Sequence, residues 1–236
     1  MEEKSEECFV VRGGEPLHGE ISLAGAKNAA TKMMIASILT EEECVFENFP
    51  QIGDTAITAQ LCQELGSEIF FRDSALHIKT RAVRTTEVTS LSRRNRIPIL
   101  AMGPLLVRSG EAKIPVVGGD KIGPRPVNMH LQALKSLGAV IEVGHDHYRA
   151  FAPEGLHGAE INFNFPSVGA TENTILASVL AKGKTIIQNA AIEPEIIDLI
   201  KMLQNMGAII ELGADRRIAI YGVERLHGTK YKILPD

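Results

Sequence analysis

Three stretches of this sequence, LCQELGSEIFF at 61–71, LQALKSLGAVIEV at 131–143 and KMLQNMGAIIEL at 201–212, end in the same way. Each is typical of an amphipathic helix that ends at a glycine and is followed by an apolar strand. Glycine is favoured there because the residue after a helix often has a positive φ. The three glycines are Gly66, Gly138 and Gly207, which recur at a spacing of about 70 residues.

A second marker has the same period. The tripeptide Leu-His-Gly occurs at 17–19, 156–158 and 226–228; the last two are 70 residues apart, and the first two are 139 apart, about two periods. Two independent markers with one period predict a threefold internal repeat. The histidines His18, His157 and His227 share this repeated position, which favours a role in a turn over metal ligation.

Each predicted unit also contains a helical segment that is apolar on nearly every side, and such helices are buried. These segments are AATKMMIASILT at 29–40, IPILAMGPLLV at 97–107 and ENTILASVLA at 172–181. The helices before the three glycines carry a polar stripe, and short alternating strands such as KTIIQNA at 184–190 complete each unit. The sequence therefore predicts an α/β fold of three similar units around a common axis, with one buried helix per unit in the centre.

Composition excludes several classes of protein. The net charge of −4 gives no basic surplus for a nucleic-acid partner. No stretch of about 18 apolar residues predicts a membrane helix, and the acidic start MEEKSEE does not predict a signal peptide. The three cysteines, Cys8, Cys44 and Cys62, form no metal-binding or disulfide pattern, so we interpret them as packed thiols of a protein in the reducing cytoplasm.

Three segments depart from the repeat, and function is expected where they do. The first, AGAKNAA at 24–30, opens the first apolar helix, whose free N–H groups suit an anion. Lys27 is unfavourable at a helix start because of the macrodipole, so it needs another reason to be there. An ordinary surface lysine is the other interpretation of Lys27.

The second segment, VVGGDKIGPRPVNMH at 116–130, predicts a tightly turned or mobile loop with Asp120 at its tip. Arg125 places a guanidinium beside the next helix start, which is typical of a phosphate or carboxylate site. The third, FPSVGATENT at 165–174, is another helix start. A solvated loop and a plain N-cap at Ser167 are the simpler interpretations of these two segments.

Together these motifs resemble the enolpyruvyl transferase family, and in particular its members that act on UDP-N-acetylglucosamine. The matching motifs are AGAKNAA, GPLLV, GGDKIGPRPVNMH, SVGATEN, NAAIEPEI and the terminal ILPD, in the family's order and at its spacings. The related enolpyruvylshikimate-phosphate synthases are expected to have a Gly-Ser-Lys-Ser type motif in place of Gly-Ala-Lys-Asn.

The resemblance implies an inside-out α/β barrel, one of two in the family, built of three repeated units with buried central helices. It implies transfer of the enolpyruvyl group of phosphoenolpyruvate to the 3′-hydroxyl of UDP-N-acetylglucosamine, the first committed step of peptidoglycan synthesis. It implies no metal and no organic cofactor, and it agrees with a cytoplasmic location.

The resemblance also assigns site residues. Lys27 would contact phosphoenolpyruvate, Asn28 would orient the substrates and Arg125 would bind phosphate. Residues implied to contact the nucleotide sugar are Arg96, Pro126, Val127, Asn128, Met129, Phe165, Pro166, Ser167 and Val168. Some family members have lysine in place of Phe165.

Asp120 aligns with a loop residue that is cysteine in most of the family and aspartate in some members. The reaction needs a proton at the methylene carbon of phosphoenolpyruvate, and a carboxylic acid can donate it if nearby anions raise its pKa. We therefore expect Asp120, Lys27 and Arg125 to be the catalytic residues of this chain.

The resemblance divides the chain into three parts. Residues 1–21 would belong to the second barrel, residues 22–232 would form the first barrel, and residues 233–236 would begin the connection between them. The second barrel, which supplies the base for the 3′-hydroxyl in the family, would have to come in cis or as a separate chain. A stand-alone nucleotide-sugar-binding or scaffold domain without catalysis is the alternative.

Overall fold

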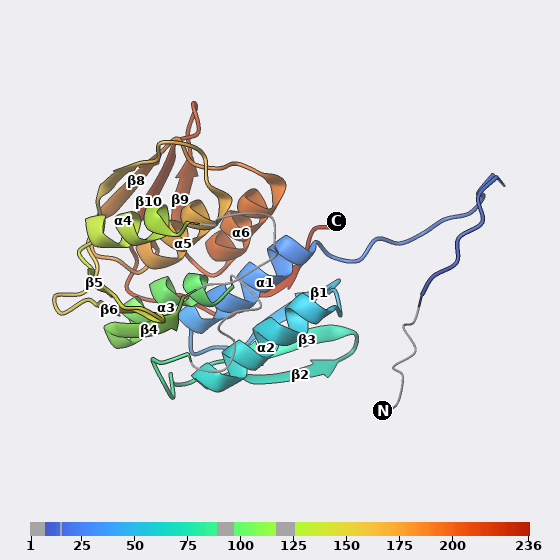
Figure 1. Cartoon of the computed structure of the whole chain (residues 1–236), viewed down its shortest axis with the longest axis horizontal. Helices are drawn as coiled ribbons and strands as arrows, with labels where there is room; N and C mark the ends of the chain where they lie inside the picture. The colour runs from blue at the N-terminus through green and yellow to red at the C-terminus, as the bar shows by residue number, and fades with distance from the viewer. Residues whose placement is uncertain (1–7, 15, 89–96, 117–125) are drawn as a thin grey trace.

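A computed structural model describes residues 8–14, 16–88, 97–116 and 126–236 (Figure 1). Its strands form three sheets. The first has the order β11-β1-β3-β2 and contains β1 (Cys44–Glu47), β2 (Glu68–Arg72), β3 (Ala75–Lys79) and β11 (Lys230–Lys232). The second has the order β4-β6-β5 and contains β4 (Glu111–Pro115), β5 (Val140–Val143) and β6 (His147–Phe151). The third has the order β7-β8-β10-β9 and contains β7 (Glu160–Asn162), β8 (Lys184–Gln188), β9 (Ile209–Leu212) and β10 (Ile218–Tyr221).

The same connection joins the strands of each sheet. In chain order, a first strand is followed by a helix and then by a second and a third strand. The third strand lies between the other two and is antiparallel to both. The helices in this position are α2 (Gly53–Leu65), α4 (Asn128–Ser136) and α6 (Pro194–Asn205). Each first strand also has a parallel neighbour: β11 pairs with β1, β7 pairs with β8, and Glu87 bridges to Lys113 of β4.

The other three helices are the apolar segments, and they lie in the interior. They are α1 (Lys27–Ala36) with the short turn η1 (Ser37–Leu39), α3 (Met102–Ser109) preceded by η2 (Ile97–Ala101), and α5 (Val168–Ser178). In α5 every residue from Ala170 to Ser178 is buried. The mixed helix and sheet content confirms the predicted α/β class.

The three stopping glycines have the backbone that the sequence predicts. The φ angles are 114° at Gly66, 98° at Gly138 and 101° at Gly207. The residue after each glycine donates its N–H to a carbonyl in the last turn of the preceding helix, at 2.8 Å for Ser67 and 3.0 Å for Ala139. The repeated Gly therefore ends each helix with the same αL closure.

The second and third Leu-His-Gly tripeptides are hydrogen-bonded to the ends of the outer helices. The His157 N–H donates to the carbonyl of Leu137, and the His227 N–H donates to that of Met206, each the residue before a stopping glycine. A Cβ at Gly158 would lie 2.2 Å from the carbonyl oxygen of Lys184, so only glycine fits there. His157 forms an isolated parallel bridge with Lys182, and His227 lies in irregular structure, so the turn role predicted for these histidines is not what the structure shows.

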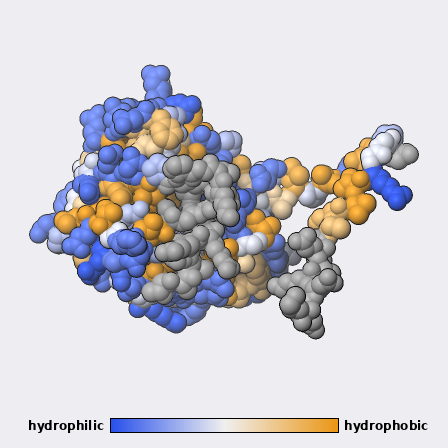
Figure 2. All heavy atoms as spheres, in the orientation of Figure 1, coloured by the Kyte–Doolittle hydropathy of each residue, from blue (hydrophilic) through white to orange (hydrophobic). Residues whose placement is uncertain are grey.

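The described part of the amino-terminal segment extends away from this body as an arm (Figure 1). Apolar side chains along it are exposed, as Figure 2 shows, including Phe9 at 100%, Leu17 at 96% and Ile21 at 87%. Cys8 is exposed in the arm, so its interpretation as a packed thiol is wrong. Cys44 and Cys62 are buried as predicted, and burial raises their pKa to about 11 and about 12.

Among the described residues, none of the helices has the length and apolar character needed to cross a membrane.

Candidate active site

The predicted site residues that the structure describes lie at or beside the starts of three helices. Lys27 and Asn28 open α1, residues 126–129 lead into α4, and residues 165–168 lead into α5. The residues before α1 and α4 are Ala26 and Val127, and neither accepts a capping hydrogen bond through its side chain. Because these two starts lack a side-chain cap, their N–H groups suit an anionic ligand.

Lys27 has a structural partner that the sequence did not reveal. Its Nζ lies 2.9 Å from Oδ2 of Asp54 in the first turn of α2. The two side chains are 48% and 40% exposed. This ion pair offsets the unfavourable position of a lysine at a helix start. The half-exposed ammonium group also remains accessible to a ligand.

The start of α5 packs closely against the first turn of α4. A Cβ at Gly169 would lie 3.1 Å from Cε1 of His130, so glycine allows this approach. The side-chain amide of Asn173 donates to the carbonyl oxygen of Ile99 at 3.1 Å, and its nitrogen lies 3.3 Å from Nδ1 of His130. Two of the predicted nucleotide-binding stretches are thereby brought together.

The predicted site residues at the three helix starts differ in how exposed their side chains are. Asn28, Pro126, Asn128 and Phe165 are exposed, whereas Val127 is buried and the side chains of Met129 and Val168 pack partly against the core. Pro166 and Ser167 are half-buried, and the Ser167 hydroxyl accepts the N–H of Ala170 at 3.4 Å. The simpler interpretation of Ser167 as an N-cap is therefore confirmed, and a ligand contact at Ser167 stays a prediction.

Three predicted site residues, Arg96, Asp120 and Arg125, lie outside the described residues.

Sequence reasoning missed a buried charged pair between two central helices. Nζ of Lys32 in α1 lies 3.9 Å from Oε1 of Glu172 in α5, and the side chains are 12% and 2% exposed. Burial raises the pKa of the Glu172 carboxyl to about 7; Lys32 opposes this rise, and Glu195 and Glu193 add to it. The sequence does give one sign of this pair, because the apolar segments 29–40 and 172–181 each contain a single charged residue.

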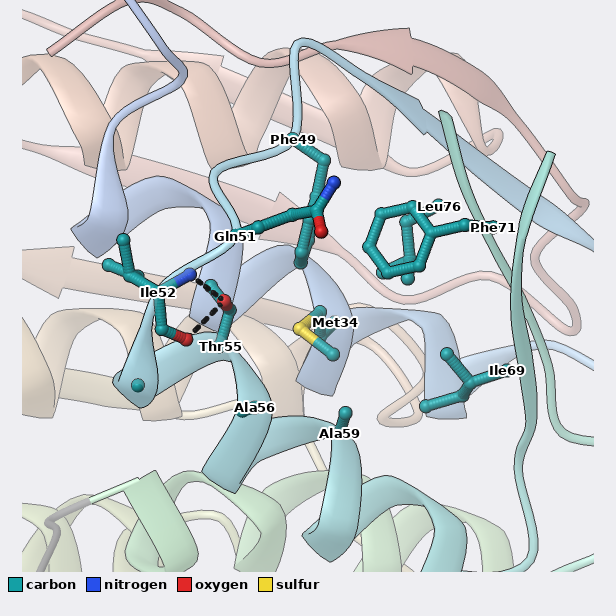
Figure 3. Close-up of a pocket in the computed structure, with 11 residues that line it drawn as sticks. Met34, Phe49, Gln51, Ile52, Thr55, Ala56, Ala59, Ile69, Phe71 and Leu76 are labelled. Carbon is teal, nitrogen blue, oxygen red and sulfur yellow. Dashed lines mark hydrogen bonds between the residues drawn. The ribbon is translucent and has the colours of Figure 1, made fainter. Parts of the chain in front are cut away.

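A pocket of about 360 Å³ opens between α2 and the first sheet (Figure 3). Met34, Phe49, Ile69 and Phe71 point into it, and Ala56 and Ala59 lie along its α2 side. None of its lining side chains is charged, so this pocket does not suit a phosphate. It also contains none of the predicted site residues.

Within the described ranges, no three His, Cys, Asp or Glu side chains are arranged to hold a metal ion.

Comparison with known proteins gives a consistent result. The family model described as EPSP synthase (3-phosphoshikimate 1-carboxyvinyltransferase) matches residues 11–236. The UDP-N-acetylglucosamine 1-carboxyvinyltransferase of Protochlamydia amoebophila is 47% identical over 234 residues, which are 96% of this chain and 50% of that protein. The one from Chlamydia abortus is 46% identical, over 96% of this chain and 52% of that protein.

Solved structures show the same fold at low identity. The enolpyruvyl transferase NikO from Streptomyces tendae has a TM-score of 0.82 at 20% identity, over 95% of this chain and 53% of NikO. EPSP synthase from Acinetobacter baumannii has a TM-score of 0.74 at 18% identity, over 92% of this chain and 50% of that chain. The chain spans about half the length of the curated relatives it matches. By its sequence match over residues 11–236, the chain belongs to the EPSP synthase (3-phosphoshikimate 1-carboxyvinyltransferase) family.

Proposed function

We propose that this chain is part of an enzyme that transfers the enolpyruvyl group of phosphoenolpyruvate to the 3′-hydroxyl of UDP-N-acetylglucosamine and releases phosphate. The observation that carries this proposal is the 47% identity to a relative named for carboxyvinyl transfer to UDP-N-acetylglucosamine. The reaction would be the first committed step of peptidoglycan synthesis, in the cytoplasm.

The fold proposed for this activity is an inside-out α/β barrel of three repeated units. Three features support it: the common strand order of the sheets, the shared glycine closure of the outer helices and the burial of α1, α3 and α5. Residues 22–232 would form this barrel. Residues 1–21 would belong to a second barrel, because the described part of this segment exposes its apolar side chains, and residues 233–236 would begin the connection to it.

The proposed substrate contacts follow the three helix starts. Lys27 would bind phosphoenolpyruvate through its half-exposed ammonium group, beside the uncapped N–H groups of α1. Asn28 would orient the two substrates. The stretches 126–129 and 165–168, which the contact between His130 and Gly169 brings together, would bind the nucleotide sugar, with Arg96 as a further contact.

The proposed chemistry is an addition followed by an elimination. The 3′-hydroxyl would give its proton to a base supplied by the second barrel, and its oxygen bonds to C2 of phosphoenolpyruvate while Asp120 gives a proton to the methylene carbon. The methyl group formed in this way would then return one proton to the Asp120 carboxylate as the phosphate group leaves from C2, which restores the double bond. Arg125 would stabilise the leaving phosphate through charge-assisted hydrogen bonds. No metal or organic cofactor takes part in this scheme.

A second candidate is a nucleotide-sugar-binding or scaffold domain without catalysis. The contact between His130 and Gly169 favours it, because this contact brings both proposed nucleotide-sugar-binding stretches together within the chain. Under the enzymatic proposal, the second barrel completes the site in cis or as a separate chain.

The two candidates are separated by an assay of phosphate release from phosphoenolpyruvate in the presence of UDP-N-acetylglucosamine. The chain is tested alone and with the half of the Protochlamydia amoebophila relative that it does not span. We expect negligible turnover alone, because positioned groups are missing, and turnover on complementation. Binding of UDP-N-acetylglucosamine without turnover in either mixture would favour the binding domain.

A further inference from the structure

Lys32 and Glu172 are largely buried charged residues within two central helices, α1 and α5. Their charged groups lie 3.9 Å apart, and the side chains are 12% and 2% exposed. The scheme proposed above for the reaction uses neither residue. The pair therefore needs its own explanation.

The cost of burial argues against stability as that explanation. Removing two charges from water is expensive, and apolar side chains of similar volume often stabilise a core as well or better. A buried ion pair does restrict how its two elements sit against each other, because sliding would separate the charges. The pair is therefore better explained by a requirement for a fixed position of α1 relative to α5.

The position of the pair in each helix supplies that need. Lys32 follows Asn28 by four residues, and Glu172 follows Val168 by four, so each lies on the same helix face as a predicted substrate contact. Four residues of helix rise by about 6 Å, so the pair lies one turn inward from both contacts. Movement at the pair is transmitted to Asn28 and Val168 through rigid helix.

Other charged groups face Glu172 from the neighbouring elements. Glu193 and Glu195 approach from the start of α6, and both raise the pKa of Glu172. His130 of α4 contacts Asn173, which follows Glu172 in the chain. Lys32 is the cation that acts on the Glu172 carboxyl from α1.

We propose that Lys32 and Glu172 are positioning residues that hold α1 against α5 and set the spacing between Asn28 and Val168. This inference rests on the proposed function, because those two residues are its substrate contacts. The pair acts at full strength when the Glu172 carboxyl is ionised, so the spacing responds to pH near neutrality.

The first test uses the free chain and no ligand. The amide signals of Asn28 and Val168 are followed by NMR from pH 5 to pH 9, together with the side-chain carboxyl carbon of Glu172. We expect the two amide signals and the Glu172 carboxyl carbon to titrate with the same midpoint. We expect Glu172→Gln to remove the pH-dependent chemical shift change of both amides. Since Glu172→Gln keeps His130, Glu193 and Glu195, movement that persists in this variant belongs to those groups and would overturn the inference.

The second test measures binding of UDP-N-acetylglucosamine by calorimetry at pH 6 and pH 8, with the complementing half present. Wild type should bind more tightly at pH 8. At pH 8 we expect Glu172→Gln to weaken binding about tenfold, because displacing a positioning group by ~1 Å has effects of that size or larger. Lys32→Arg keeps the positive charge and should retain near-wild-type binding, and the exposed control Lys201→Met should leave binding unchanged.

The outcomes separate the two proposals. If wild type and Glu172→Gln bind equally, the positioning role is wrong and the proposed function stands. If wild type binds no nucleotide sugar, the proposed function fails, and the NMR titration still decides whether the pair couples the two helix starts.

Discussion

The ammonium nitrogen of Lys27 lies 2.9 Å from a carboxylate oxygen of Asp54, and this contact joins the first turns of α1 and α2. Both side chains are close to half exposed, so the pair stabilises the fold by about 0–1 kcal/mol. The fold therefore depends little on Lys27. A strong effect of its removal on catalysis would show that its role is chemical.

Replacement of Lys27 by methionine should separate stability from activity. We expect Lys27→Met to change the free energy of unfolding by less than about 1 kcal/mol, because the ion pair with Asp54 is close to half exposed. In the complemented enzyme, kcat/KM for phosphoenolpyruvate should fall about 100-fold or more, because a charge-assisted phosphate contact is removed. Urea unfolding and the phosphate-release assay measure the two effects.

Asp54→Asn is the matched variant, since it breaks the same ion pair and keeps the lysine. It should retain most of the activity that Lys27→Met loses. Equal kcat/KM for Lys27→Met and wild type would show that Lys27 is an ordinary surface lysine.

Replacement of Glu172 by glutamine should make the chain more stable at high pH. The pKa of Glu172 is about 7 in the folded state, against 4.5 for the ordinary carboxyl. Wild type therefore loses stability as pH rises from 4.5 through 7, because the folded state holds a proton that the unfolded state has released. Glu172→Gln has no such loss. The difference in free energy of unfolding between Glu172→Gln and wild type should therefore shift in favour of the variant by about 3 kcal/mol between pH 4.5 and pH 8.

Urea unfolding of both proteins across pH 4.5 to 8 measures this difference. Glu154→Gln, at an exposed turn position, is the control and should follow wild type across the range. A difference between Glu172→Gln and wild type that does not change with pH would mean that the buried carboxyl is ionised throughout.

Two glycines of the repeat should tolerate alanine to different degrees. At Gly138 a Cβ has no neighbour nearer than 3.7 Å, so alanine there costs only the left-handed backbone, about 1 kcal/mol. At Gly158 a Cβ would meet the Lys184 carbonyl oxygen at 2.2 Å, and strand β8 must shift, at a cost of about 3 kcal/mol. Thermal unfolding should rank wild type above Gly138→Ala and Gly138→Ala above Gly158→Ala. The reverse order of the two variants would contradict the close packing of Gly158 against Lys184.

Much of the fold could be predicted because its signals are local. The ends of α2, α4 and α6 are encoded within a few residues, where an amphipathic pattern stops at Gly66, Gly138 and Gly207. The burial of α1, α3 and α5 follows from side chains that are apolar on every face. The exposure of Cys8 was missed, because a cysteine gives no local sign of whether its segment packs against the body.

The contacts of the site could be predicted less well because they join distant segments. Asp54 is 27 residues from Lys27, and Glu172 is 140 residues from Lys32. The 140-residue spacing is about two periods of the repeat, but a period does not show which side chains meet, since the pairs form only when separate helices pack. A lysine at a helix start and a glutamate in an apolar helix do show that a partner is needed, without showing which residue supplies it.

Asp120 should make the complemented enzyme resistant to fosfomycin, an epoxide that alkylates the family's loop thiol. A carboxylate attacks an epoxide far more slowly than a thiolate does. Asp120→Cys should restore covalent labelling with loss of activity. Buried Cys44 and Cys62 should not be labelled, because burial raises their pKa to about 11 and about 12 and keeps them as thiols.

Mass spectrometry after incubation with the epoxide and UDP-N-acetylglucosamine checks this expectation. Cys8→Ser removes the exposed thiol and serves as the background for every measurement. Rapid stoichiometric labelling of that background with loss of activity would contradict the assignment of Asp120.

Identification of the acceptor of the enolpyruvyl group is the decisive measurement for the proposed function, because the family model and the curated relatives are named for different acceptors. The complemented enzyme is given phosphoenolpyruvate with equal concentrations of UDP-N-acetylglucosamine and 3-phosphoshikimate, and the products are identified by mass spectrometry. We expect the enolpyruvyl group to be transferred to UDP-N-acetylglucosamine alone, with one phosphate released for each molecule of product. Enolpyruvyl transfer to 3-phosphoshikimate, with UDP-N-acetylglucosamine left unmodified, would contradict it.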